Sequence, residues 1–432
     1  MGKGALVAIL LFFAPSVAAV FYAENRSDAD RAVDEWTSSA FVGKSDGQTG
    51  SGGSAASGRK GVSVSSTEQL RRALETAQNG DVISLMPGRY PGIVISNVKK
   101  NGNVTVTSAD PSRPAIIEEL LIRNSAGLTL SNVELAANTA TLQKMKQDSN
   151  PAGDPSATGQ RRRAFRFLYI VTQSERIGLH KLNVHGPADD ADTAQFVRPL
   201  IVRDSREVTV SNSRFSHMQH GLEMLNLDGF RVINNEYSDL RTDGVRGGDS
   251  SNVEIAGNIF TDFRPAPGDH PDGIQLWSTP RGTKLINISI HDNLIVQGNG
   301  GTAQGVFLRD VKNNFAFQNV EIKDNLIIGG LYNAVAINSV QGGKIAGNRI
   351  VEGPDIKRVR IRIDNSTGID MSGNSAPNYV ITRSQVEKSD NKVNGQSSKK
   401  SASLVAEWLD GKQGRRRSDS ALQVRLSGNR GL

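Results

Sequence analysis

One short pattern decides the architecture of this chain. It is VEIAGNIF at residues 253–260. Apolar and polar residues alternate over its first half, which is the period of a β-strand with one buried face. A Gly-Asn pair follows, and these residue types adopt the left-handed backbone conformation more readily than others. The pattern therefore predicts a short strand that ends in a bend.

The same pattern recurs along most of the chain. Its other copies are LTLSNVEL (128–135), IGLHKLNV (177–184), VTVSNSRF (208–215), FRVINNEY (230–237), ISIHDNLI (288–295), VEIKDNLI (320–327) and GKIAGNRI (343–350). The short steps between copies are 22 or 23 residues, and longer steps imply insertions. A unit of this length cannot bury its apolar face alone, so the copies must stack on one another. A coil with three short strands fits one turn of a parallel β-helix, with asparagines stacked at the bend as an internal ladder.

The composition agrees with an all-β fold and favours an anionic partner. The 44 glycines and the low aromatic content, 5%, suit short strands and tight turns better than a helical bundle. Cysteine is absent, so the chain needs no oxidising compartment, although nothing prevents its export. The net charge of +7 favours a polyanion, either a nucleic acid or an acidic polysaccharide.

The N-terminus has the order of a secretory signal. Lys3 is followed by the apolar run ALVAILLFFAP (5–15) and by small residues near position 19. We expect a signal peptide over 1–19, with an uncleaved membrane anchor as the alternative, and a Gly/Ser-rich flexible linker over 20–61. Either form exports the rest of the chain, to the outside or the periplasm. Export weakens the nucleic-acid interpretation of the basic charge, and membrane contact is expected only if the signal is not cleaved.

The ordered part is expected to begin with a helix. Leu70, Ala73, Leu74 and Ala77 lie on one face of a helical pattern, and Ser66 is a suitable N-cap. An amphipathic helix followed only by strands predicts a cap on a solenoid. The predicted domain order is a β-helix of about 10–12 coils over 62–390 and then a basic, poorly ordered tail over 391–432.

The segment GDVISLMPGRYPGIVI (80–95) resembles the first coil of the secreted, pectate-lyase-like right-handed parallel β-helix proteins. The resemblance covers roughly 62–390 and implies a right-handed solenoid. This superfamily includes polysaccharide lyases, pectin-type glycoside hydrolases, alginate C5-epimerases and phage tailspikes. Because one fold supports all of these, the activity has to be argued from the site.

A second strand pattern locates a candidate site. Its copies are HGLEM (220–224), DGVRG (243–247), DGIQL (272–276), QGVFL (304–308) and NAVAI (333–337). Aligning them predicts Leu222, Val245, Ile274, Val306 and Val335 as core positions. The residues before the aligned glycine or alanine should form a line on one face, since adjacent strands lie about 4.8 Å apart. That line is His220, Asp243, Asp272, Gln304 and Asn333.

This line has the residue types of acid–base chemistry. Asp243 and Asp272 on adjacent coils are like charges, so one pKa should rise and leave an acid beside a base. The predicted catalytic residues are His220, Asp243, Asp272, His270 and Arg246. The predicted substrate-binding residues are Glu223, Gln275, Gln304, Arg309, Asp269, Arg241 and Trp277. Asp-Gly is also an ordinary turn pair, so the prediction depends on the coincidence of these groups on neighbouring coils.

The site also resembles those of known β-helical enzymes. Pectin-type hydrolases carry catalytic aspartates at this pre-glycine position and a histidine in a His-Gly step, although here the histidine coil comes first and no Asp-Asp or Arg-Ile-Lys equivalent is present. The stretch DHPD (269–272) is similar to the Asp-Pro-His-Asp stretch of alginate epimerases, in a different order. No metal ligands are predicted, but Ca²⁺ among the aspartates is a candidate cofactor.

Three classes of function remain open from the sequence. The first, which we favour, is a lyase that cleaves uronic-acid linkages of an acidic polysaccharide by β-elimination, using a histidine base and an arginine cation. The second is an inverting glycoside hydrolase with Asp243 and Asp272 as its acid and base, or a C5-epimerase. The third is a solenoid that binds a glycan without cleaving it.

Overall fold

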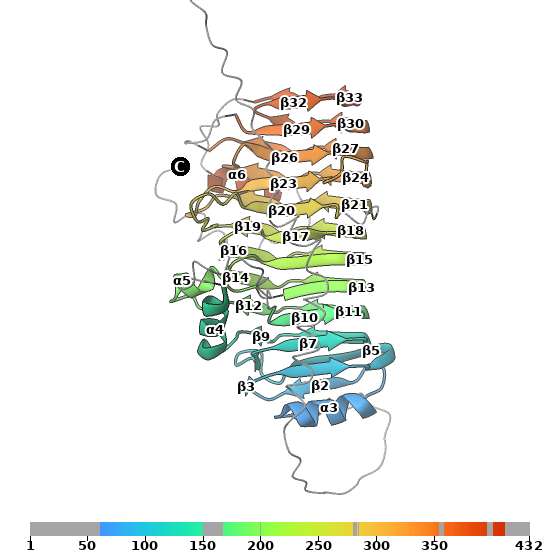
Figure 1. Ribbon diagram of the computed structural model, residues 1–432, viewed down its shortest axis with the longest axis vertical. Coiled ribbons are helices and arrows are strands. Elements are labelled where there is room, and N and C mark those ends of the chain that lie inside the picture. The colour runs from blue at the N-terminus through green and yellow to red at the C-terminus, as the bar shows by residue number, and fades with distance from the viewer. Residues whose placement is uncertain are drawn as a thin grey trace, which may run out of the picture.

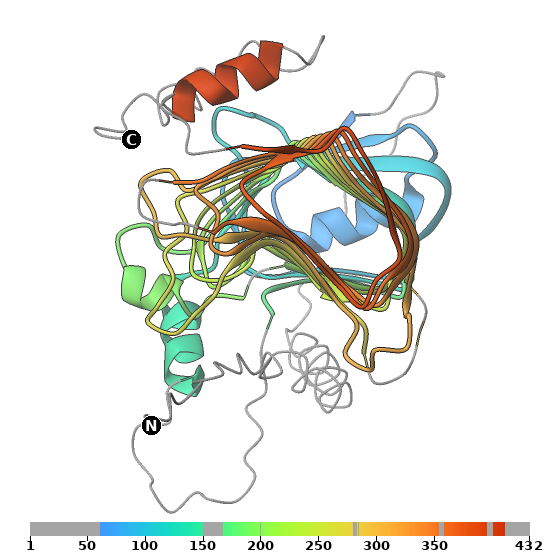
Figure 2. The same ribbon diagram turned by 90° about the horizontal axis from the view of Figure 1, so that it is seen from above.

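A computed structural model describes residues 61–149, 167–198, 200–279, 283, 285–353, 358–394 and 401–410. These residues wind into a stack of coils, with the chain rising along one axis (Figure 1). Seen along that axis, successive coils superpose around one interior (Figure 2). The predicted signal peptide (1–19) and the predicted linker, apart from Gly61, lie outside the described residues. None of the described helices has the length and apolar character needed to cross a membrane.

Each coil contributes strands to three parallel sheets. Sheet I carries the candidate site and consists of β4 (Ile93–Ser96), β7 (Leu120–Arg123), β10 (Tyr169–Thr172), β13 (Leu200–Ser211), β15 (Leu222–Ile233), β17 (Val245–Gly248), β20 (Asp272–Trp277), β23 (Gln304–Arg309), β26 (Asn333–Asn338), β29 (Arg360–Asp364) and β32 (Tyr379–Thr382). Strands β13 and β15 continue through a bend into the second sheet and so join the two.

Sheet II follows the bend. It consists of β1 (Gly61–Val64), β2 (Val82–Leu85), β5 (Lys99–Ser108), β8 (Ala126–Ser131), β11 (Glu175–His180), the second halves of β13 and β15, β18 (Ser251–Ala256), β21 (Leu285–His291), β24 (Phe317–Lys323), β27 (Val340–Ala346), β30 (Thr367–Ser372) and β33 (Val386–Ser389). The VEIAGNIF pattern predicts eight of them, namely β8, β11, the second halves of β13 and β15, β18, β21, β24 and β27.

Sheet III closes each coil, and its twelve strands correspond to twelve coils in the described part. They are β3 (Arg89–Tyr90), β6 (Ile116–Ile117), β9 (Glu134–Leu135), β12 (Asn183–His185), β14 (Arg214–Met218), β16 (Glu236–Leu240), β19 (Ile259–Thr261), β22 (Leu294–Val296), β25 (Leu326–Ile328), β28 (Arg349–Val351), β31 (Ser375–Ala376) and β34 (Lys392–Val393). Every pairing between coils is parallel, as the repeat requires.

Asparagines at the bend form the predicted internal ladder. Asn235, Asn258, Asn293, Asn325, Asn348 and Asn374 are buried on successive coils. Each side-chain amide donates to the Oδ1 of the next asparagine, at 2.8–3.1 Å, with Asn391 as the acceptor for Asn374, and also to a backbone carbonyl. The residue before each of them has a positive φ, for example Asn234 at 57° and Gly257 at 66°. Because every amide is satisfied by its neighbours, the ladder fixes the register between coils.

Stacked aromatic rings explain why a glycine follows the candidate-site line. Phe215, Tyr237 and Phe260 stack inside the solenoid with ring centroids 4.9 and 4.8 Å apart. A Cβ at Gly221 would lie 2.5 Å from the ring of Tyr237, and one at Gly244 would lie 2.4 Å from that of Phe260. The backbone can pass this close to the rings only where no side chain points inward. The glycines therefore fill an inward position, and the residues before them point out.

The N-terminal end of the solenoid is covered by α3 (Thr67–Thr76) (Figure 1). Leu70 and Leu74 are buried in the main core, and the Ser66 side chain accepts from the Gln69 amide as the N-cap. The Gln69 side chain accepts from Ser65 and not from Ser66. The helix thus shields the apolar interior of the first coil from water.

Of the tail predicted to be poorly ordered, 391–432, the structure describes 391–394 and 401–410, and the rest lies outside the described residues. Helix α6 (Ser401–Asp410) lies outside the solenoid (Figure 2), and its Leu404 and Val405 are buried. They pack on outward-facing apolar residues of sheet III, namely Ile259, Leu294, Val296, Leu326, Ile328 and Val351. The basic composition of the tail predicts a solvated segment. The tail also contains the apolar residues of α6, and these cover the outer face of sheet III.

Candidate functional site

The outer side of sheet I presents the predicted line in the predicted register. Asp272 pairs with Gln304, and Ile274 pairs with both Val245 and Val306. The amide of Gly221 donates to the carbonyl of Asp243, and that of Gly244 donates to the carbonyl of Asp272. His220, Asp243, Asp272 and Gln304 are therefore vertical neighbours on successive coils, as the sequence predicts.

A second row, three residues further along each strand, faces the same way. On three successive coils the two rows form contacts within the coil, which pair His220 with Glu223, Asp243 with Arg246, and Asp272 with Gln275. The outward side chains are three residues apart, and not two, because the glycine and the core residue that follows it both face inward. We call these six residues the polar cluster.

His220 and Glu223 form the first pair. Nε2 of His220 lies 2.8 Å from Oε2 of Glu223, off the line of a good hydrogen bond, and both side chains are buried. Burial lowers the pKa of His220, while Glu223 opposes this shift. Burial would raise the pKa of Glu223, but its contact with His220 and the charges of Arg246 and Arg198 lower that pKa to about 2. The pair is thus a carboxylate beside an imidazole whose Nδ1 has no partner among the described residues.

Asp243 and Arg246 form the second pair, with Nη1 of Arg246 3.0 Å from Oδ2 of Asp243. The other oxygen, Oδ1, accepts the backbone amide of Asp272 at 3.0 Å. The Arg246 guanidinium lies 5.3 Å from the centroid of the buried Trp277 ring, within the range of a cation–π contact. Arg246 is thus held in a fixed position by an acid and an aromatic ring.

Asp272 and Gln275 form the third pair. Gln275 Nε2 donates to Asp272 Oδ2 at 2.6 Å, and Oδ1 of Asp272 is buried without a partner among the described residues. Burial and the neighbouring Asp243 charge raise the pKa of Asp272 well above its usual value. Burial and the Asp243 charge therefore both favour the protonated form of Asp272, the direction of shift that the sequence argument expects for one of the two aspartates.

The polar cluster is covered. His220, Glu223, Asp243, Asp272 and Gln275 are each exposed by 5% or less. The ring of Phe167 meets that of His220 edge-on, with centroids 6.3 Å apart. Buried polar atoms without partners are rare in proteins, and here they occur on His220, Glu223 and Asp272. Their concentration in one cluster points to chemistry more than to structural support.

The remaining predicted residues occupy different places. Arg241 binds Asp269 through two nitrogens, at 2.7 and 3.3 Å, and also contacts Gln195. This pair fixes the turn before Asp272. His270 is exposed in that turn and makes no hydrogen bond or ion pair with the described residues. The structure therefore does not join His270 to the polar cluster.

The line continues differently on later coils. Gln304 accepts from Asn333 at 2.7 Å, and Asn333 accepts from Arg360 at 3.0 Å. Here the outward residues three positions later are Phe307 and Ala336, which offer no polar partner. On these later coils the hydrogen bonds between side chains join neighbouring coils, whereas in the polar cluster the side chains pair within one coil.

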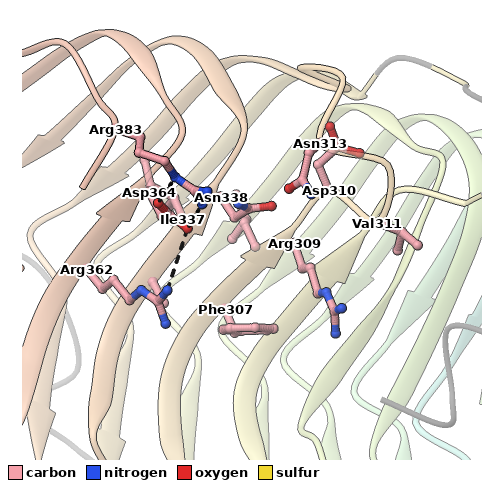
Figure 3. Close-up of a pocket in the computed structure, with 12 residues that line it drawn as sticks. Phe307, Arg309, Asp310, Val311, Asn313, Ile337, Asn338, Arg362, Asp364 and Arg383 are labelled. Carbon is pink, nitrogen blue, oxygen red and sulfur yellow. Dashed lines mark hydrogen bonds and ion pairs between the residues drawn. The ribbon is translucent and has the colours of Figure 1, made fainter. Parts of the chain in front are cut away.

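A pocket lies beside these later coils, over β23, β26 and β29 (Figure 3). It encloses about 590 Å³, counting space open to solvent. Phe307 lies between Arg309 and Arg362 in this view, with Asp364 and Arg383 beyond. The other lining residues are Leu308, Asp310, Val311, Asn313, Ala336, Ile337 and Asn338.

Comparisons with known proteins agree with the architecture. Residues 200–386 match the family described as a right handed beta helix region. The described coils have the mostly-β, parallel β-helix architecture that this match indicates. No curated protein matches the sequence.

Solved structures similar to this β-helix protein have diverse activities. An alginate lyase from Paenibacillus sp. str. FPU-7 is 12% identical, with 76% of this chain and 99% of that chain covered and a TM-score of 0.46. A polygalacturonase from Erwinia carotovora ssp. carotovora is 15% identical, covering 82% and 100%, with a TM-score of 0.41. PfbA, a surface adhesin of Streptococcus pneumoniae, is 11% identical, covering 77% and 93%, also with a TM-score of 0.41. None of these similarities assigns a reaction to this chain.

A Ca²⁺ ion does not fit the polar cluster of this β-helix protein. Ca²⁺ takes six to eight oxygen ligands, whereas both oxygens of Asp243 and one of Asp272 are already bonded. In the part of the chain that the structure describes, no group of three or more histidine, aspartate or glutamate side chains could hold a metal ion.

Sequence reasoning missed Phe307, Arg362, Asp364 and Arg383 as site residues. The later strands β29 and β32 lack the glycine or alanine that marks the earlier copies, so the sequence pattern extends only to β26. The alternating RIRID (360–364) was the available signal, because its Ile361 and Ile363 pair with the core residues Val335 and Ile337.

Proposed function

We propose that this protein is an exported enzyme that cleaves an acidic polysaccharide by β-elimination at the polar cluster. The observation that carries the proposal is Asp272, a buried carboxylic acid of raised pKa, lying in line with a carboxylate-supported histidine and a fixed arginine. These are the acid, the base and the cation that elimination from a uronate requires.

Each group has one role. His220 removes the proton α to the sugar carboxylate through Nδ1, and Glu223 stabilises the imidazolium that forms. Arg246 neutralises the carboxylate as negative charge develops on it. The C–O bond to the leaving sugar then breaks as the C=C bond forms, and Asp272 gives its proton to the leaving oxygen. Asp243 positions Arg246 and, through its charge, keeps Asp272 protonated.

Access is a further requirement of the proposal. Because the cluster side chains are 5% exposed or less, apart from the slightly more exposed Arg246, the substrate has to displace the residues that cover them. Phe167 is one such residue, since its ring lies against His220. Catalytic geometry often tightens only once substrate is bound, so a covered cluster is compatible with this role.

An inverting glycoside hydrolase is the second candidate, favoured by the two carboxyl groups on adjacent coils. Asp272 would be its acid and Asp243 its base. Both oxygens of Asp243 are already occupied, by Arg246 and by the Asp272 amide, so neither is free to activate water. One strand spacing of about 4.8 Å also falls short of the roughly 6.5–9.5 Å that inversion uses. The occupied oxygens of Asp243 are therefore the observation that favours elimination over inverting hydrolysis.

The test is an assay of the full chain against pectate, alginate and a neutral polysaccharide. Ultraviolet absorbance of the unsaturated sugar and the number of reducing ends are followed together. We expect unsaturated product from an acidic substrate only. Reducing ends without unsaturation would establish the hydrolase, and inversion at C5 seen by NMR would establish the epimerase. Retention on the glycan without any product would support the non-cleaving solenoid.

A further inference from the structure

The pocket over β23, β26 and β29 lies on the same outer face as the polar cluster. Strand β23 is the coil directly after β20, which carries Asp272, and β29 is two coils further. At about 4.8 Å per coil, the pocket extends from roughly 5 to 14 Å beyond Asp272 along the axis. Cluster and pocket could therefore contact one extended molecule.

Charge in the pocket is positive. Arg309, Arg362 and Arg383 all line it. Of the two lining aspartates, Asp310 is buried and its oxygens accept from Ser278 and from the amides of residues 312, 314 and 316. Its carboxylate serves the turn and not the pocket.

Asp364 contacts two of these arginines. Arg383 binds it at 2.8 Å, and Arg362 lies 3.6 Å away. Burial would raise the pKa of Asp364, but its bonds to Arg383 and Thr382 lower it, so the group stays ionised. Of the described side chains that line the pocket, three carry a guanidinium group and two carry a carboxylate, so the lining has a surplus of positive charge that attracts an anion.

The arginines on either side of the ring are partly dehydrated. Burial lowers the pKa of Arg309 and is also the largest influence on that of Arg362, which is lowered. A cation that has lost part of its hydration gains more from an incoming anion than one in bulk water does. A guanidinium also matches a planar carboxylate with two parallel hydrogen bonds.

Phe307 adds an apolar surface between these two charges (Figure 3). Its side chain is half-buried, so part of the ring is open to the pocket. The C–H face of a pyranose ring can pack on an aromatic ring while its carboxylate reaches a flanking arginine. A flat apolar surface flanked by fork-shaped cations fits a uronate better than it fits an inorganic anion.

We infer that this pocket is a subsite for a uronate unit of the polysaccharide, and that the polysaccharide lies along the solenoid axis from the polar cluster toward the C-terminal coils. The inference rests on the proposed function for the identity of the substrate. One coil spacing is close to the length of one sugar unit, so the pocket holds units beyond the one whose linkage breaks. Short substrates that end before the pocket should bind and react poorly.

The test measures binding by titration calorimetry in chains that carry Asp272→Asn, which prevents turnover. The probes are a uronate tetramer, a uronate dimer and a neutral tetramer. We expect Arg309→Gln and Arg362→Gln each to weaken binding of the uronate tetramer about tenfold, the loss of one charged hydrogen-bonded contact. Phe307→Ala should weaken it as well. Arg231→Gln is the matched control, because Arg231 is an exposed arginine of sheet II bound to Glu254.

The outcomes separate the subsite from the proposed reaction. Unchanged tetramer binding by both arginine variants, at an unchanged melting temperature, would overturn the subsite even if the full chain makes unsaturated product. Equal losses for the neutral and the uronate tetramer would also overturn it. Tenfold losses confined to the uronate tetramer would support the subsite even if the wild-type chain makes no product, in which case the proposed reaction is what fails. Arg309→Lys, which keeps the charge but not the fork, should lose less than Arg309→Gln.

Discussion

Two stretches of the outer face of sheet I belong to one parallel ladder and differ in the side chains that they present. Over β15, β17 and β20, ionisable side chains pair within each coil and are covered. Over β23, β26 and β29, hydrogen bonds run between coils, and an open pocket with three arginines results. The difference arises in the second row, where Glu, Arg and Gln give way to Phe and Ala. Within one parallel ladder, substitutions in a single row of side chains thus change the chemistry of the surface, and the register shift between β26 and β29 adds to the difference.

The largest expected effect is on Asp272, at the boundary between the two stretches. Asp272→Asn removes the proton that the leaving oxygen receives, so turnover should fall by about 10³-fold. The Asn carbonyl can still accept from Gln275, so the melting temperature should not fall. Asp370→Asn, on an exposed aspartate of sheet II that pairs with Lys344, is the matched control and should keep full activity. Wild-type turnover by the Asp272 variant would remove the cluster from the reaction.

Glu223 tests whether the first pair acts as a unit. It is a positioning residue, because it acts through His220. Glu223→Gln should lower kcat by about 10²-fold, within the usual range for general acid–base assistance, and leave KM nearly unchanged. The low-pH limb of the kcat profile should shift to lower pH, because loss of the carboxylate removes the influence that raises the pKa of His220. If neither kcat nor the low-pH limb of its pH profile changed, the pair of His220 and Glu223 would have a structural role only.

Replacing Gly244 tests whether the inward glycines let the candidate-site residues before them face outward. Gly244→Ala places a Cβ 2.4 Å from the ring of Phe260 and 2.7 Å from the carbonyl oxygen of Gly273. We expect a loss of about 2 kcal/mol in the free energy of unfolding, as for other overpacked cores. Chemical denaturation measures it. Gly61→Ala meets nothing within 4 Å and is the control. Equal stability of both variants would contradict the role assigned to the glycine.

The smallest effect is a pH dependence of stability. The pKa of Asp272 is higher in the folded protein than the usual 3.8, so the folded state keeps a proton that the unfolded chain releases. Between these two pKa values, raising the pH therefore lowers the free energy of unfolding, by at most about 1.4 kcal/mol per pH unit. Asp272→Asn removes this dependence. The difference in melting temperature, variant minus wild type, should rise as the pH rises above about 4. A difference that is flat with pH would mean that Asp272 is not a buried acid.

Much of the fold could be read from local patterns. The VEIAGNIF repeat predicts eight of the sheet II strands and the asparagine ladder, because a strand period and a bend residue are properties of neighbouring residues. The line of His220, Asp243 and Asp272 followed from the same reasoning. The pairs with Glu223, Arg246 and Gln275 did not, because the inward glycine changes the outward spacing only when the coil closes on its aromatic stack.

The sequence by itself determined that coils stack in register and therefore that residues some 25 positions apart become neighbours. Only the tertiary structure decided which of those neighbours are buried and that the pKa of Asp272 is raised. It also decided where the arginine-lined pocket lies and that α6 packs on sheet III. The physical reason is that these properties depend on interactions of different range along the chain. Backbone conformation is set by adjacent residues, whereas burial and electrostatic shifts depend on everything packed around a group, and that environment exists only in the folded chain.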